Sequence, residues 1–190
     1  MSLKVMLVDN ESVRSAILAQ ALNDNGYEVI ARVKPGPGLL AQVALHLPDM
    51  IVVDTDSPDR DILESMHLLS EHNPLPVVMF ADEENETIIQ EAIRSGVSSY
   101  VVKGVDMERV NSIMSVSIAR FREYQAIKKE LKETKSELVD TKLIDKAKRL
   151  LMKNKGVDED QAYEAMRKLS MDANQKMSQV AQNIVNVYEL

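Results

Sequence analysis

Apolar residues in the first 118 positions fall into two alternating kinds of segment. Short continuous apolar runs predict five strands, at residues 3–8, 28–33, 50–53, 77–81 and 99–102. The segments between them carry apolar residues at helical spacing and predict helices, at residues 12–25, 39–47, 62–71, 87–95 and from 107 onward. The strands lack the polar alternation of half-exposed strands, which indicates a parallel sheet covered on both faces. The pattern therefore predicts a doubly wound α/β domain with a five-stranded parallel sheet.

The last predicted helix, which begins at residue 107, continues into a charged segment with a different apolar pattern. No Gly or Pro interrupts residues 107–142, so a long helical connector is expected. Tyr124, Leu131 and Leu138 fall seven residues apart, and Ile127 lies between the first two. The intervening positions are half polar, so a single solvated helix and a parallel two-stranded coiled coil both fit. We favour the coiled coil, with these four residues as the seam of a homodimer.

Residues 144–190 have the periodicity of three short helices in an all-α bundle. The first is expected to end near Gly156, and Asp158 with Gln161 fits a capping box for the second. Asp172 with Gln175 repeats that spacing for the third. The expected buried positions are Ala162, Ala165, Met166, Leu169, Met177, Val180, Ala181, Ile184 and Val187. The predicted domains are thus 1–118, a helical linker at 119–143, and 144–190.

Charge divides the chain in the same way. Residues 1–118 hold 8 Lys and Arg against 18 Asp and Glu, a formal charge of −10, whereas residues 119–190 hold 15 against 12, a charge of +3. An acidic input domain joined to a polyanion-binding output domain fits this asymmetry better than one enzyme does.

Composition excludes several classes of protein. With no Cys there are no disulfides or thiolate metal sites, and no apolar run approaches the roughly 18 residues of a membrane span. The first ten residues lack the apolar region and cleavage site of a signal peptide. We expect a cytoplasmic protein without membrane contact.

Acidic residues follow the predicted strands. Asp9 and Asn10 come after the first strand, Asp54 and Asp56 after the third, and Lys103 after the fifth. Because ligands bind at the carboxyl ends of parallel strands, these side chains can form an oxygen-rich site for Mg2+ in which an Asp accepts a phosphoryl group. Capping of the following helices is the alternative explanation.

Cations and one aromatic residue remain outside the apolar stripes of the C-terminal helices. They are Lys146, Lys148, Arg149, Tyr163, Arg167, Lys168 and Lys176. This combination suits contact with phosphates and stacking on unpaired bases, although Lys and Arg also serve simply to solvate a helix.

Three segments of residues 1–118 resemble the response-regulator receiver domain: V-D-N at 8–10, I-V-V-D at 51–54 and S-Y-V-V-K at 99–103. The resemblance implies that Asp54 is the phosphoacceptor and that Lys103 neutralises the phosphoryl group. It also implies that Asp9, Asn10, Asp54 and the backbone carbonyl of Asp56 hold Mg2+. Asn10 stands where the family has a second Asp, Ala81 replaces a hydroxyl-bearing residue and Gly104 replaces Pro, so weak metal binding and a weak phosphate response are expected.

The last 45 or so residues resemble the ANTAR domain, an RNA-binding antitermination module. The motifs are D-x-A-K-x-x-L-M at 145–152, A-Y-x-x-M-R-x-x-S-M at 162–171 and V-A at 180–181; Arg149 departs from the usual Gly. The resemblance implies an antiterminator, with no turnover of its own, that binds tandem stem-loops in a nascent leader RNA.

Within this family, two segments are similar to the nitrate/nitrite-assimilation antiterminators: V-D-T-D-S-P-x-R-D at 53–61 and V-M-F at 78–80. That similarity implies a sequestering sensor protein as partner, with a histidine kinase as the second choice. A DNA-binding response regulator and a dimerising protein adaptor are the other function classes.

Overall fold

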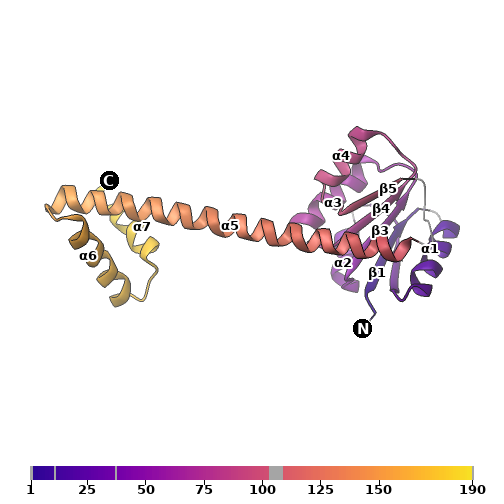
Figure 1. Cartoon of the computed structure of the whole chain (residues 1–190), viewed down its shortest axis with the longest axis horizontal. Coiled ribbons are helices and arrows are strands. Elements are labelled where there is room, and N and C mark those ends of the chain that lie inside the picture. Colours follow the sequence, from indigo (N-terminus) through magenta and orange to yellow (C-terminus); the bar gives the residue numbers. More distant parts are fainter. Residues whose placement is uncertain (1, 11, 37, 103–108, 190) are drawn as a thin grey trace. The chain divides into compact units, whose positions relative to one another are not determined.

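The computed structural model of the 190-residue chain describes residues 2–10, 12–36, 38–102 and 109–189. The chain divides into two compact units, Met1–Gln125 and Ala126–Leu190 (Figure 1). Within the described residues, no helix combines the length and the apolar content needed to cross a membrane.

The first unit is built on one five-stranded sheet. Its strands are β1 (Lys4–Asp9), β2 (Glu28–Val33), β3 (Met50–Thr55), β4 (Val77–Ala81) and β5 (Ser99–Val102). Neighbouring strands are parallel in the order β2-β1-β3-β4-β5, so the strand order reverses between β1 and β3. The predicted doubly wound sheet is confirmed, and this reversal is where such folds place their ligands.

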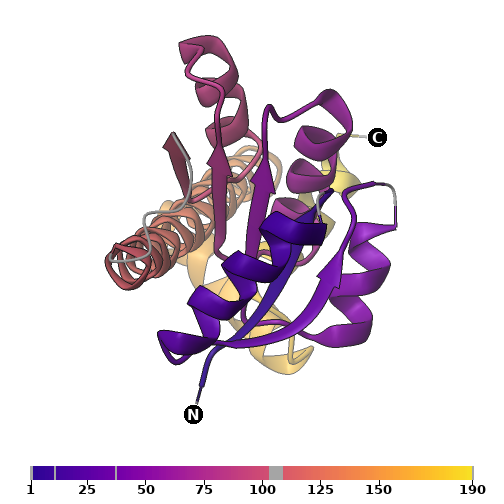
Figure 2. The ribbon, with the colours of Figure 1, turned by 90° about the vertical axis from the view of Figure 1, so that its right-hand side faces the viewer.

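Helices cover both faces of the sheet (Figure 2). They are α1 (Ser12–Asp24), α2 (Leu39–His46), α3 (Arg60–His72), α4 (Glu86–Arg94) and the start of α5 (Val110–Lys155). Met6 and Val8 of β1 pack in the core with α2, α3 and α4, whereas Val5 and Leu7 pack in the core with α1 and α5. Successive strand residues point to opposite faces, which is why β1, β3 and β4 are buried at nearly every position.

The second unit is a bundle of the end of α5, α6 (Glu159–Asp172) and α7 (Met177–Tyr188). Its buried core consists of Ala147, Leu151, Ala162, Met166, Val180, Ala181 and Val185. The expectation of a separate first helix is wrong, because α5 runs for 46 residues through the linker into the bundle. With no Gly or Pro from 110 to 155, nothing in the local sequence ends the helix earlier.

The predicted ends of the bundle helices are confirmed at Gly156 and Asp158 but not at Asp172. Gly156 has φ +66° and follows α5, and Asp158 and Gln161 form the predicted capping box with bonds of 2.8 and 3.2 Å. Asp172, in contrast, is the last residue of α6. Its expected capping role is wrong, and Gln179 Oε1 instead accepts the Lys176 backbone N–H at the start of α7.

Three residues expected in the bundle core are exposed. Ala165, Leu169 and Val187 line a groove of about 420 Å3 that is formed by the end of α5, α6 and α7. Leu169 and Val187 are 52% and 68% exposed, so their burial was predicted wrongly. Apolar periodicity identifies the apolar face of a helix, but a bundle of three helices is too small to cover the edges of that face.

Candidate functional site

The carboxyl ends of β1 and β3 bring two acidic side chains together. Asp9 ends β1, and its register partner on the neighbouring strand is Asp54 of β3. Both are buried, with 9% and 5% of their surface exposed, while Asn10 and Asp56 are exposed just beyond the strands. Residues 45 positions apart in sequence thus meet at the strand-order reversal, as the strand pattern predicted.

The backbone carbonyl of Asp56 connects two loops of this site. It accepts the backbone N–H groups of Asp82, at 3.0 Å, and Glu83, at 3.1 Å. Within the described residues, no group of three or more His, Cys, Asp or Glu side chains is placed to hold a metal ion. The oxygen donors at this edge of the sheet suit Mg2+ chemically.

The loop after β4 has a further attachment that the sequence did not suggest. The Tyr100 hydroxyl donates to the Glu83 carbonyl oxygen at 3.0 Å. Burial, and next the charge of Glu83, raise the pKa of Tyr100, so the phenol stays a donor at neutral pH. The loop is therefore bonded to Asp56 on one side and to β5 on the other.

Ala81, at which this chain departs from the receiver pattern, lies at the end of β4. It is fully buried and pairs in register with Thr55 and Val102. It offers no hydroxyl toward the site. Lys103 and the neighbouring Gly104 lie outside the described residues, so the role predicted for Lys103 stays a prediction.

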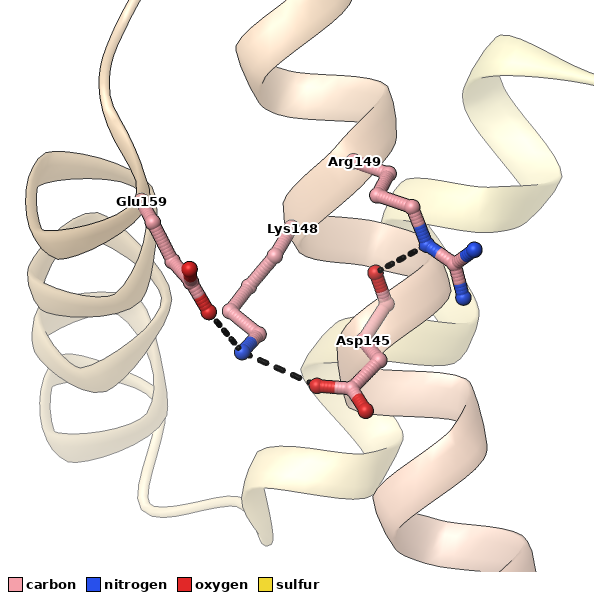
Figure 3. A network of polar contacts seen from close by, with 4 residues as sticks. All are labelled: Asp145, Lys148, Arg149 and Glu159. Atoms are coloured by element: carbon pink, nitrogen blue, oxygen red, sulfur yellow. Dashed lines mark hydrogen bonds and ion pairs between the residues drawn. The ribbon is translucent and has the colours of Figure 1, made fainter.

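Lys148 lies at the centre of a polar network in the bundle (Figure 3). Its Nζ is 2.7 Å from Glu159 Oε1 and 2.9 Å from Asp145 Oδ1, and its side chain is only 16% exposed. Hydrogen bonds to Glu159 and Asp145 raise the pKa of Lys148, and the hydrogen bond from Lys148 lowers the pKa of Asp145. Lys148 and Asp145 are therefore both charged at neutral pH. The sequence analysis did not identify either acid as a partner of Lys148. The three-residue spacing of Asp145 and Lys148 could have indicated the first ion pair, whereas Glu159 lies on the next helix and no spacing rule connects it to Lys148.

The other predicted nucleic-acid residues differ in their surroundings. Lys146 pairs with Glu189 at 2.7 Å, and Arg167 pairs with Glu164 at 3.2 Å. Arg149 Nε donates to the backbone carbonyl of Asp145 at 3.2 Å (Figure 3). Tyr163 is 43% exposed, and Lys168 and Lys176 are exposed as well.

Tyr163 and Arg167 lie four residues apart on α6 and so occupy one face of that helix. An exposed ring beside a guanidinium can stack a base and bind the neighbouring phosphate.

The predicted seam residues lie on the exposed middle of α5. Tyr124, Ile127, Leu131 and Leu138 are each more than half exposed in the single chain. Exposed apolar side chains at this spacing are available to a second helix, but they leave the single-helix alternative open.

Two family models match the chain. The response regulator receiver domain matches residues 5–115, and the ANTAR domain matches residues 132–185. The first match includes the acidic strand ends, and the second includes the end of α5, all of α6 and most of α7.

Similar proteins agree with this division. The transcriptional regulatory protein PdtaR of Mycobacterium tuberculosis is 25% identical over 96% of this chain and 89% of its own length. The nitrate regulatory protein of Klebsiella oxytoca is 41% identical over 68 residues, which are 36% of this chain and 17% of that protein. Among solved structures, the signal receiver domain of a modulated diguanylate cyclase from Desulfovibrio desulfuricans covers 65% of this chain and 99% of its own, with 21% identity and a TM-score of 0.55. That structural likeness concerns the fold alone.

Proposed function

Because this chain belongs to the response regulator receiver family and carries an ANTAR domain after the receiver, we propose that it is a transcriptional antiterminator that binds stem-loops in nascent leader RNA. The observation that carries the proposal is the exposed face of α6, where Tyr163 and Arg167 lie four residues apart within the ANTAR match. Binding there would hold the RNA in a stem-loop and keep a terminator hairpin from forming. Action on nascent bacterial transcripts would place the protein in the cytoplasm.

Each side chain has a distinct proposed role in RNA binding. The ring of Tyr163 stacks on an unpaired base of the loop, and Arg167 binds a phosphate or a base edge. The further phosphate contacts are Arg149, Lys168 and Lys176. Lys146 is a further proposed phosphate contact, because it is an exposed, ion-paired cation as Arg167 is. Lys148 was also predicted to bind RNA, but it lies between two carboxylates.

The receiver is the proposed input. A carboxylate oxygen of Asp54 would accept the phosphoryl group of a donor, with Asp9, Asn10, Asp54 and the Asp56 carbonyl holding Mg2+ and Lys103 compensating the added charge. Mg2+ would offset the negative charge of the transferred group. Because Ala81 has no hydroxyl to bond that group, we favour control by a sequestering sensor protein over control by a histidine kinase.

A homodimer completes the proposal. Tyr124, Ile127, Leu131 and Leu138 would form a parallel coiled-coil seam, which gives each dimer two RNA-binding bundles. Two bundles on one particle suit tandem stem-loops, because the second contact then becomes intramolecular.

A gel-shift experiment tests the function directly. The wild-type chain should bind stem-loop RNA from leader transcripts of its host and leave duplex DNA of the same sequence free. Preferential binding of the duplex would make the protein a DNA-binding response regulator. Binding of neither nucleic acid would favour a protein adaptor and refute the proposal.

A further inference from the structure

The network around Lys148 crosses the turn between two helices (Figure 3). Asp145 and Lys148 lie three residues apart on α5, and Glu159 is the first residue of α6. The ion pair between Lys148 and Glu159, at 2.7 Å, therefore joins two helices that are connected in sequence only by residues 156–158, while the pair between Lys148 and Asp145, at 2.9 Å, lies within α5. Lys148 fixes the beginning of α6 to the side of α5.

The charges of the network make Lys148 a poor phosphate ligand. One ammonium group lies between two carboxylates, so the three side chains together carry a formal charge of −1. A phosphate that approached Nζ would also approach both carboxylates, which repel it. Only 16% of the Lys148 side chain is exposed, whereas that of its neighbour Lys146 is 48% exposed.

The position of Glu159 links this network to the proposed RNA contacts. Glu159, Tyr163 and Arg167 follow one another at four-residue intervals along α6, so they lie on one face of the helix. A rotation or tilt of α6 against α5 would move the ring of Tyr163 and the guanidinium of Arg167 together. The ion pair at Glu159 opposes that movement at the first turn of the helix.

A third ion pair lies on the opposite side of α5. Lys146 Nζ lies 2.7 Å from Glu189, which directly follows α7. Residues two apart on a helix point in nearly opposite directions, so Lys146 and Lys148 reach different partners. The bundle core has only seven buried residues, three of them Ala, and such polar contacts therefore matter for how its helices are oriented.

We infer that Lys148 is a positioning residue for RNA binding: with Asp145 it holds Glu159, and so orients the Tyr163 and Arg167 face of α6, without contacting phosphate itself. This inference deepens the proposed function and depends on it.

The salt dependence of RNA affinity tests the inference in the full chain. The probe is a stem-loop RNA enriched on the wild-type chain from a pool with randomised loops. Lys148→Met should weaken binding about three- to tenfold at every salt concentration, with an unchanged slope of log affinity against log salt. Arg167→Met is the matched control: it removes an exposed cation and should lower the slope by about 0.7–0.9.

Glu159→Gln distinguishes a phosphate-binding Lys148 from a positioning Lys148, because the two roles predict opposite changes in RNA affinity. If Lys148 bound phosphate, removing the competing carboxylate would tighten RNA binding. The positioning role predicts weaker binding although a negative charge has been removed. Lys148→Arg should restore most of the affinity, because a guanidinium can bridge both carboxylates.

Several results would overturn the inference. They are a slope that falls in Lys148→Met as in Arg167→Met, tighter binding by Glu159→Gln, and a loss of helical circular dichroism in Lys148→Met that accounts for the weaker binding. A pool from which no RNA is enriched would refute the proposed function and this inference with it. If the wild-type chain does enrich an RNA, the salt slope of the Lys148→Met variant tests this inference separately from the proposed function.

Discussion

The receiver and the C-terminal bundle assemble their candidate sites in different ways. Asp9 and Asp54 are 45 residues apart and meet because their strands pair within a fully buried part of the sheet. Tyr163 and Arg167 are four residues apart, and their place depends on how one exposed helix lies on a small core and on surface ion pairs. The receiver site is therefore set by strand pairing, and the bundle site by helix orientation.

The two regions also differ in charge and in the ligand they suit. The acidic first 118 residues bring carboxylates together, which suits a cation, and the mildly basic remainder suits a polyanion. If the regions act independently, changes at the acidic site should leave RNA affinity intact, and changes on α6 should leave phosphorylation intact. Each of the following experiments tests one side of this comparison.

The largest expected effect is at Asp54. Asp54→Asn should abolish labelling by acetyl phosphate with Mg2+, because no carboxylate remains to accept the phosphoryl group, while RNA affinity stays unchanged. Asp56→Asn is the matched control; labelling should persist because the proposed ligand there is the backbone carbonyl. Mass spectrometry measures the label. Undiminished labelling of Asp54→Asn would place the acceptor elsewhere.

The next largest effect concerns the seam of α5. Leu131→Glu combined with Leu138→Glu should leave monomers in sedimentation, because four carboxylates would be buried in each dimer. The affinity for tandem stem-loops should fall roughly a hundredfold, with single stem-loops unaffected, since only a dimer gains from two attachments.

Val139→Glu serves as the control for this seam. Val139 is as exposed as its neighbour Leu138 but lies about a quarter turn away around the helix. This variant should remain dimeric. Intact dimers in the double variant would instead move the interface away from α5.

A moderate effect is expected at Tyr163. Tyr163→Ala should weaken stem-loop binding by about 1–3 kcal/mol through loss of base stacking. Tyr163→Phe keeps the ring and should retain most of the affinity, and circular dichroism should show equal helical content in both. Equal loss in the two variants would assign the effect to the hydroxyl group and not to stacking.

The smallest effect is expected at Ala81. Ala81→Thr supplies the missing hydroxyl at the end of β4 and should produce a severalfold change in RNA affinity on phosphorylation, where the natural sequence shows little. Ala81→Val has the same shape without the hydroxyl and controls for crowding at this fully buried position. A large phosphorylation response of the natural protein would contradict this prediction and would favour kinase control.

Some features of the molecule follow from local sequence alone. The five strands, the helices between them and the capping box of Asp158 and Gln161 were predicted correctly, because burial pattern and short-range hydrogen bonds act at fixed sequence spacing. The meeting of Asp9 and Asp54 was predicted as well, since parallel strands place their carboxyl ends at one edge.

Other features depend on neighbours that are distant in sequence. The Tyr100 bond to Glu83 and the Lys148 bond to Glu159 form only once the strands and helices have packed. Likewise, the exposure of Leu169 and Val187 depends on the number of helices that share the core, and apolar periodicity gives no information on that number.

The sequence by itself therefore determined the elements, the order of the two domains and the residue types available for phosphate and RNA chemistry. The tertiary structure alone decided that Lys148 faces two carboxylates and that the Asp56 carbonyl is held by the loop after β4. The physical reason is distance: hydrogen bonds within a helix turn have a fixed sequence spacing, whereas an ion pair between two helices depends on how their cores pack.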